Sequence, residues 1–394
     1  MSIREFDVQK ARLETPACQK IIHFNNAGAS LMPEPVVNTL INHLKLEANL
    51  GGYEAAAKVK DRIESVYNTI ATLINAKREE IAVIENATRA WDMAFYSIPF
   101  RAGDRILTAR AEYSSNYLAY LQLARKLGIE IRVIPNDEHG QVSIDALEQM
   151  IDSDVKLISI SHIPTNGGLV NPATEIGRIA SDHDILYLLD ACQSVGQMPV
   201  DVQKIRCDML SATGRKYLRG PRGTGFLYMR QELVKQLEPP FIDLHAARWV
   251  SKDEYRIRPD ARRFENWESF IAGKLGLAEA VSYAMQWGLE NIWQRIKKLG
   301  EKLRGNLTGL PGIEIQDIGL VKCGIVTFTV RGKEAETVKK ALNERGINVS
   351  TSTRESTLLD MESRSLDSVI RASVHYYNTE GEIERFCSIV EALT

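Results

Sequence analysis

The stretch "ILYLLDACQSVGQMPVDVQKIRCDMLSATGRKYLRGPRGTGFLYM", residues 185–229, decides the fold of this chain. One apolar run ends at Asp190, and a second run, residues 207–213, ends just before Lys216. A third run, residues 223–229, follows a Gly-rich turn. Near-continuous apolar runs of this length are typical of strands that are buried on both faces of a sheet. The stretch therefore predicts three buried strands, with polar residues at the ends of two of them.

The same pattern extends toward the N-terminus, where helical patterns separate four further apolar runs. These runs lie at residues 79–86, 104–110, 129–135 and 155–163. Strands that alternate with helices indicate βαβ units and a sheet that helices cover on both faces. We therefore predict an α/β fold whose large domain contains a mostly parallel, seven-stranded sheet.

The C-terminal third predicts a smaller α+β domain. A long helical stretch, residues 272–307, is followed by strand patterns at residues 313–318, 323–330, 347–352 and 369–377. We expect three parts in all. They are an N-terminal segment, residues 1–20, that joins the small domain or a partner chain; a large domain, residues 21–270; and a small C-terminal domain, residues 271–394.

The composition is that of a globular protein. A length of 394 residues favours two domains, and a formal net charge of −2 argues against a dedicated nucleic-acid binder. The 5 cysteines lie far apart without a CxxC pair, which argues against a metal site or a disulfide framework. The first ten residues show no signal-peptide pattern, and no apolar run is long enough to cross a bilayer. We therefore expect a cytoplasmic protein that binds neither membranes nor nucleic acids.

Polar residues follow four of the predicted strands, and sites in parallel α/β sheets form at the carboxyl ends of strands. Thr88 begins a helix whose free N–H groups could hold an anion, and Asn166 follows another strand. Taken singly, Asp190 is an ordinary helix cap and Lys216 an ordinary surface lysine. Together, the four strand ends suit a ligand that has a phosphate, a basic ring nitrogen and an aldehyde.

Eight motifs then extend the pattern along nearly the whole chain. They are "NNAGAS", "NATRA", "AEYSSN", "SHIPTNGG", "DACQSVGQMPVDV", "CDMLSATGRKYLRGPRGTGFLY", "RRFENWE" and "IRASVHYYNT". In these motifs the chain resembles fold-type I enzymes of the class V aminotransferase family, which includes cysteine desulfurases, selenocysteine lyases and carbon–sulfur lyases. The resemblance implies pyridoxal 5'-phosphate (PLP) as cofactor, an amino acid as small-molecule substrate, and a homodimer with its site at the interface.

The resemblance also implies which residues hold the cofactor. Lys216 matches the lysine that is joined covalently to the PLP aldehyde and that moves the substrate α-proton. Asp190 matches the carboxylate that pairs with the ring nitrogen. The other matches are Gln193 and Asn166 at the phenolic oxygen, Thr88, Thr213 and Arg215 at the phosphate, and Ser114, beside Tyr113, where a ring stacks on the cofactor. Arg89, next to Thr88, is also expected to bind the cofactor.

Four further residues match positions that bind substrate. Arg371 falls where the family holds the substrate carboxylate, and Arg354 could compensate for Ser350, which stands where a second arginine is usual. Asn25 and Ala29, in the "NNAGAS" motif, complete the predicted substrate site.

The prediction of the reaction depends on the absence of cysteine from one segment, residues 347–373. Residues 347–373 contain no cysteine, although the desulfurases of the family carry a nucleophilic thiol before the arginine. We therefore exclude a persulfide-forming desulfurase and predict a PLP-dependent C–S lyase, similar to hercynylcysteine sulfoxide lyases, that cleaves a cysteine-derived thioether or sulfoxide by β-elimination. An aminotransferase or epimerase of an amino acid is the alternative. A third hypothesis is a non-catalytic module that binds a dinucleotide or nucleic acid through residues 214–225.

Overall fold

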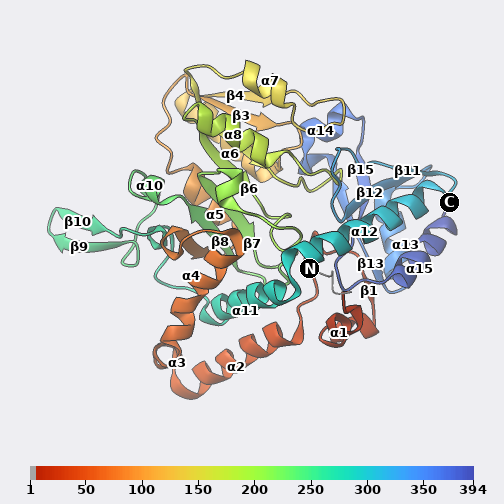
Figure 1. Cartoon of the computed structure of the whole chain (residues 1–394), viewed down its shortest axis with the longest axis horizontal. Coiled ribbons are helices and arrows are strands. Elements are labelled where there is room, and N and C mark those ends of the chain that lie inside the picture. Colours follow the sequence, from red (N-terminus) through yellow and green to blue (C-terminus); the bar gives the residue numbers. More distant parts are fainter. Residues whose placement is uncertain (1–5) are drawn as a thin grey trace.

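A seven-stranded sheet forms the centre of the large domain in the computed structural model, which describes residues 6–394 (Figure 1). Its strands are β2 (Ile81–Ile84), β3 (Arg105–Ala109), β4 (Glu130–Ile134), β5 (Val155–Ser161), β6 (Leu186–Asp190), β7 (Met209–Thr213) and β8 (Gly225–Met229). They lie in the order β2-β8-β7-β6-β5-β3-β4, and β8 runs antiparallel to both neighbours. The prediction of an α/β fold with a mostly parallel sheet of seven strands is confirmed.

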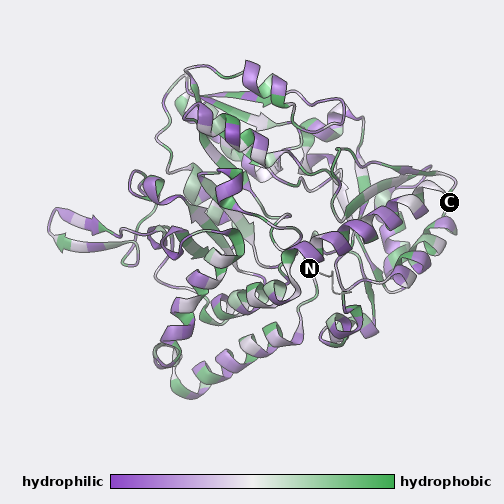
Figure 2. Ribbon diagram, in the orientation of Figure 1, coloured by the Kyte–Doolittle hydropathy of each residue, from purple (hydrophilic) through white to green (hydrophobic). Residues whose placement is uncertain are grey.

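Alternate side chains of each strand enter two separate cores, as the two-residue period of a strand requires. On one face, Ile106 and Leu188 pack with Trp91 and Tyr120 of helices α5 (Ala87–Phe95) and α6 (Ser114–Leu127). On the other face, residues such as Leu189 pack with helices α4 (Lys60–Ile74), α8 (Ala173–Asp182) and α11 (Ile271–Trp287). Figure 2 shows hydrophobic residues concentrated in the strands, while the covering helices mix both kinds.

The large domain contains further helices and short turns. They are α2 (Glu34–Leu50), α3 (Gly52–Lys58), α7 (Ile144–Gln149), α9 (Val202–Ile205) and α10 (Gln231–Val234), with the short 3₁₀ turns η2 (Arg78–Glu80) and η3 (Ala261–Phe264). A two-stranded hairpin, β9 (Ala247–Ser251) and β10 (Glu254–Ile257), projects away from the body (Figure 1). Helix α11 contacts α2 and α4.

The small domain has an antiparallel sheet in the order β11-β12-β15-β14. Its strands are β11 (Ile313–Ile315), β12 (Ile325–Val330), β14 (Ser350–Thr353) and β15 (Ser368–Ser373). Its helices are α12 (Leu289–Thr308), α13 (Ala335–Asn343), α14 (Leu358–Ser363) and α15 (Glu380–Glu391), with the turn η4 (Arg354–Ser356). The helical stretch predicted at residues 272–307 is two helices, because Gly288 adopts φ +79° between α11 and α12.

The described part of the N-terminal segment contacts the small domain. It contains α1 (Val8–Leu13) and η1 (Pro16–Gln19), and the Arg12 guanidinium donates to Glu382 of α15 at 2.8 Å. The next strand, β1 (Ile22–His23), pairs in parallel with β13 (Ile347–Asn348). The division of the chain at residues 20 and 270 stays a prediction. Within residues 6–394, no helix has the length and apolar character that a membrane span requires.

Candidate active site

A cavity of about 220 Å³ lies at the carboxyl ends of β5, β6 and β7, beside the first turn of α5. The strand register explains why distant residues meet here, because Asp190 is paired with Ser161 of β5 on one side and with Ser211 of β7 on the other. Six residues predicted to bind the cofactor line the cavity: Thr88, Asp190, Gln193, Thr213, Arg215 and Lys216. The sheet therefore brings most of the predicted cofactor site together.

Lys216 lies in a turn that is held rigidly after β7. The buried Arg219 anchors this turn: its backbone N–H donates to the Lys216 carbonyl at 2.9 Å, and its guanidinium donates to the Leu31 carbonyl and to the Tyr376 hydroxyl. Burial lowers the pKa of Lys216, while Cys192 and Asp190 act in the opposite direction. An amine with a lowered pKa is more often neutral, and the neutral amine can act as a nucleophile or a base.

Asp190 presents a buried carboxylate to the cavity. One oxygen, Oδ1, accepts from the Cys192 backbone N–H at 2.9 Å, and Oδ2 accepts from Asn116 Nδ2 at 3.1 Å. These two bonds fix the plane of the carboxylate without neutralising its charge. Such a group suits a partner that brings a positive charge, for example a protonated ring nitrogen.

The first turn of α5 forms an anion-binding corner of the cavity. Asn86 caps the helix by accepting from the Arg89 N–H at 2.9 Å, and Thr88 and Arg215 line the same corner. Gly225 of β8 allows this approach, since a Cβ there would lie 2.6 Å from the Ala212 carbonyl oxygen and 3.1 Å from the Ala87 nitrogen. A helix start with a nearby hydroxyl and guanidinium is suited to a phosphate.

Two buried amide oxygens in this region have no partner within the described chain. Gln193 lines the cavity and donates to the Ala27 carbonyl at 3.1 Å, but its Oε1 is unpaired. Asn166 donates to Thr357 Oγ1 at 3.0 Å, and its Oδ1 is likewise unpaired. An unpaired buried acceptor costs about 1–3 kcal/mol, so both side chains fit a site that binds a polar molecule. With the carboxylate, the amine and the anion-binding corner, they fit PLP.

Arg371 of β15 reaches the rim of the cavity from the small domain. Its Nε donates to Ser350 Oγ at 3.0 Å, and its guanidinium also donates to Thr165, which lines the cavity. Burial lowers the pKa of Arg371 to about 10, with a further contribution from Arg215. The guanidinium is oriented by neutral partners only, which leaves its charge for an incoming carboxylate.

The structure places several predicted residues outside the cavity lining, including Asn166 and Arg371, whose contacts are given above. Arg89 lies on the outer side of α5, where it pairs with Glu85 at 3.5 Å and with Asp92 at 3.7 Å. Ser114 donates to the Glu355 carbonyl, so its neighbour Tyr113 reaches the cavity instead. Arg354 pairs with Asp367 near the surface. In each case an acceptor outside the cavity binds the side chain.

Asn25 and Ala29 also lie outside the lining. They form a tight turn in which the Ala29 N–H donates to the Asn25 carbonyl at 3.0 Å, and the Ala29 carbonyl accepts from His23 Nε2 at 2.8 Å. The same turn contacts Arg215, which donates to the Gly28 carbonyl. This turn therefore supports Arg215 from behind rather than lining the cavity.

Several lining residues were not among the predicted site residues. They are Asn86, Ala87, Asn116, Ser161, Ile163 and Cys192. Asn116 could have been found, because it lies three positions after Tyr113 in the "AEYSSN" motif, one turn along a helix from it. Ser161 and Cys192 carry no comparable signal, since each is a small residue within an apolar context.

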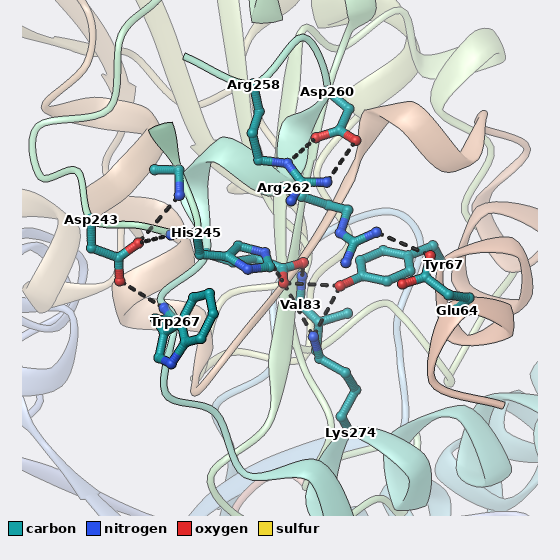
Figure 3. Close-up of polar contacts among 12 residues, drawn as sticks. Glu64, Tyr67, Val83, Asp243, His245, Arg258, Asp260, Arg262, Trp267 and Lys274 are labelled. Atoms are coloured by element: carbon teal, nitrogen blue, oxygen red, sulfur yellow. Dashed lines mark hydrogen bonds and ion pairs between the residues drawn. The ribbon is translucent and has the colours of Figure 1, made fainter. Parts of the chain in front are cut away.

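A second polar cluster surrounds the buried Glu265 in the "RRFENWE" motif. Tyr67, His245 and Lys274 point toward the same carboxylate (Figure 3). The distances to its Oε2 are 2.9 Å from the Tyr67 hydroxyl and 3.1 Å from Lys274 Nζ. Through these side chains the cluster connects three elements: helix α4, helix α11 and the segment that precedes β9. It also holds the chain just before Trp267, whose side chain is mostly exposed.

Known proteins similar to this chain identify its family. The model of the family "Aminotransferase class-V" matches residues 22–386. A probable cysteine desulfurase of Methanothermobacter thermautotrophicus is 31% identical over 98% of each chain. One of Pyrococcus abyssi is 30% identical over 98% of this chain and 97% of its own. The apo structure of a cysteine desulfurase from Thermococcus onnurineus NA1 superposes with a TM-score of 0.92, at 30% identity over 100% of this chain and 99% of that chain.

These relatives contradict our predicted reaction. We predicted a lyase for cysteine-derived thioethers or sulfoxides, with an aminotransferase or epimerase as alternative, and we excluded a desulfurase. Relatives at about 30% identity over nearly the full chain are instead named cysteine desulfurases. The exclusion was wrong because it rested on one loop: the missing thiol in residues 347–373 bears on where sulfur is received and does not identify the bond that is cleaved. The expected cofactor, PLP, is supported by the family match.

Proposed function

Because the chain belongs to the class V aminotransferase family, we propose that it is a PLP-dependent cysteine desulfurase that cleaves the Cβ–sulfur bond of cysteine. One observation carries the proposal. In a chain 31% identical to a probable cysteine desulfurase over 98% of its length, Lys216 and Asp190 line one cavity, and Arg371 donates to Thr165, which lines the same cavity. These side chains supply an amine, a carboxylate for a ring nitrogen, and a guanidinium for an amino-acid carboxylate.

Arg371, Lys216 and Asp190 have separate roles around the cofactor. PLP, when bound, draws electrons from the α-carbon of an amino acid. Arg371 binds the cysteine carboxylate, with its orientation set by Ser350 and Thr165. Lys216 takes the α-proton, because its lowered pKa makes the neutral amine available as a base. Asp190 keeps a negative charge next to the ring nitrogen.

Sulfur leaves through an acceptor thiolate. The thiolate attacks the cysteine sulfur, so that an S–S bond forms and the Cβ–S bond breaks. The electron pair of that bond goes to Cβ, which takes up a proton, the α-proton held by Lys216 returns to the α-carbon, and the products are alanine and a persulfide. Cys192 is a poor acceptor although it lines the cavity, because burial raises the pKa of its thiol, as does Asp190. The other four cysteines, Cys18, Cys207, Cys323 and Cys387, are buried, so we infer that the acceptor is a thiol from outside this chain.

The products of cysteine turnover test this proposal. The PLP-loaded protein is incubated with L-cysteine, with and without added dithiothreitol, and alanine, pyruvate and sulfide are quantified. We expect alanine and sulfide in equal amounts, with a rate that rises when the external thiol is added. Lys216→Ala should abolish alanine formation. Pyruvate and ammonia in place of alanine, or turnover that ignores the added thiol, would contradict the proposal.

We also propose that the enzyme works in the cytoplasm as a homodimer with its site at the interface. Phe241, Leu244 and Trp267 are exposed to 63%, 73% and 57%, which supports a surface that a second chain covers. Light scattering on the PLP-loaded protein should give twice the chain mass of 44.2 kDa. A monomer at micromolar concentration would contradict the dimer, and cell fractionation tests the location.

A further inference from the structure

A second buried carboxylate, that of Glu112, lies behind Asp190. Glu112 is 3% exposed and follows β3 by three residues. Its Oε1 accepts from Ser161 Oγ at 2.6 Å and from the Tyr113 N–H at 2.9 Å, and its Oε2 accepts from the Ser161 N–H at 2.9 Å. These bonds hold the side chain in a single orientation against β5.

Asn116 joins the two carboxylates. Its Nδ2 donates to Glu112 Oε1 at 2.8 Å and to Asp190 Oδ2 at 3.1 Å. A side-chain amide nitrogen has two hydrogens, so this pair of bonds uses both of them. Asn116 is 3% exposed, and it cannot turn without losing its contact to one carboxylate. The orientation of Asp190 is therefore coupled to that of Glu112.

No cation within residues 6–394 forms an ion pair with Glu112, and this makes its charge sensitive to its surroundings. The titratable groups that influence it are Asp190, on the neighbouring strand β6, and Tyr120 and Tyr187 nearby. Burial raises the pKa of Glu112 to about 7, and Asp190 contributes in the same direction, while the bonds from Ser161 and Asn116 oppose them. A positive group on the far side of Asp190 would stabilise both carboxylates as anions.

We propose that Glu112 is a positioning residue for the cofactor: through Asn116 it fixes the Asp190 carboxylate, and its charge strengthens the hold of Asp190 on the proton of the ring nitrogen. This role of Glu112 depends on the proposed function only in that Asp190 faces the ring. The site would then contain two carboxylates, Glu112 and Asp190, that are connected by the side-chain amide of Asn116. The charge on Glu112 then acts on the cofactor without touching it.

The protonation of the ring nitrogen tests this proposal without any cysteine, so that a failed desulfurase assay does not affect the result. The protein is loaded with PLP that carries ¹⁵N in the ring, and the ¹⁵N chemical shift is followed by solid-state NMR from pH 6 to pH 10. For Glu112→Gln we expect the ring nitrogen to lose its proton at a pH lower by about 0.5 unit or more than in the wild type. An unchanged midpoint would overturn the charge effect.

Glu80→Gln is the matched control. Glu80 is also buried, at 4% exposure, and it accepts from backbone N–H groups, at 2.8 Å from Lys77 and 3.1 Å from Gln231, away from the cavity. We expect this variant to leave the ring midpoint unchanged. A shift equal to that of Glu112→Gln would show a general effect of disturbing the core and would overturn the proposal.

Asn116→Ala keeps the proposal testable if Glu112→Gln fails to fold. It breaks the bridge but leaves Glu112 with its bonds from Ser161 and Tyr113. Since a lost hydrogen bond of this kind corresponds to about 1 kcal/mol, PLP should dissociate about fivefold more readily. PLP affinity equal to that of the wild type would overturn the positioning role.

Discussion

Glu112 and Glu265 are both buried glutamates, yet their surroundings push their pKa values in opposite directions. Burial favours the neutral form of each. At Glu265 the ammonium of Lys274, with His245 and the Val83 N–H, outweighs burial and lowers the pKa to about 2. At Glu112 burial raises the pKa to about 7, and the carboxylate of Asp190 acts in the same direction. The comparison shows that a buried carboxylate with a cation is a fixed structural charge, whereas one beside another anion can change its charge near neutral pH.

The largest loss of stability is expected when Lys274, the cation that pairs with Glu265, is removed. Lys274→Met should lower the free energy of unfolding by about 3–5 kcal/mol, because it leaves Glu265 buried without its partner. Urea denaturation measures the change. Lys302→Met, in an exposed pair with Glu380, is the control and should leave the unfolding midpoint unchanged. Equal effects of the two variants would contradict the assignment of Glu265 as a buried fixed charge.

The pH dependence of stability should differ in sign between Glu112 and Glu265. Glu112 has a folded pKa near 7, above the ordinary value of 4.5, so the folded apoprotein binds its proton more tightly and loses this stability as pH rises from 4.5 through 7. Relative to Glu112→Gln, the wild type should lose about 1–3 kcal/mol over that range. For Glu265 the sign reverses, and stability is lost as pH falls from 4.5 toward 2. If the contributions of Glu112 and Glu265 to stability changed with pH in the same direction, the comparison would be contradicted.

Single hydrogen-bond donors should give the smallest effects. Tyr67→Phe removes a donor to Glu265, and Ser161→Ala removes the hydroxyl donor to Glu112. Each should cost about 1–2 kcal/mol while its carboxylate is ionised. The cost of Tyr67→Phe should be the same at pH 5 and pH 8, whereas that of Ser161→Ala should shrink at pH 5, where Glu112 is protonated. Denaturation at the two pH values measures both, and a pH-independent Ser161→Ala would contradict the raised pKa.

Much of the fold could be predicted from the sequence because the decisive signals are local. The seven strands of the large sheet are short apolar runs, and burial on both faces leaves few polar positions to confuse the pattern. Asp190 and Lys216 were predictable for a related reason, since each follows such a run directly and the sheet edge then determines where it lies. The break at Gly288 was missed because a single glycine is also tolerated inside a helix.

Parts of the site depend on contacts that the sequence does not show. Arg89 is adjacent to Thr88, but successive helical residues point about 100° apart, and local carboxylates bind Arg89 on the outer side. The choice between Ser114 and Tyr113 likewise depends on a carbonyl 241 residues away. Glu112 was missed because its main donor, Ser161, lies 49 residues along the chain on another strand. The reaction was mispredicted from the absence of one residue type in one loop.

The most direct test of the account asks which lysine carries the cofactor. The PLP-loaded protein is reduced with borohydride, which makes the bond between PLP and its lysine permanent, and the digested peptides are analysed by mass spectrometry. We predict that the modification lies on Lys216, in the peptide that follows β7, and that Asp190→Ala weakens PLP binding without changing the modified position. Attachment to any other lysine, or no attachment after incubation with excess PLP, would contradict the central claim that this cavity is built around the amine of Lys216.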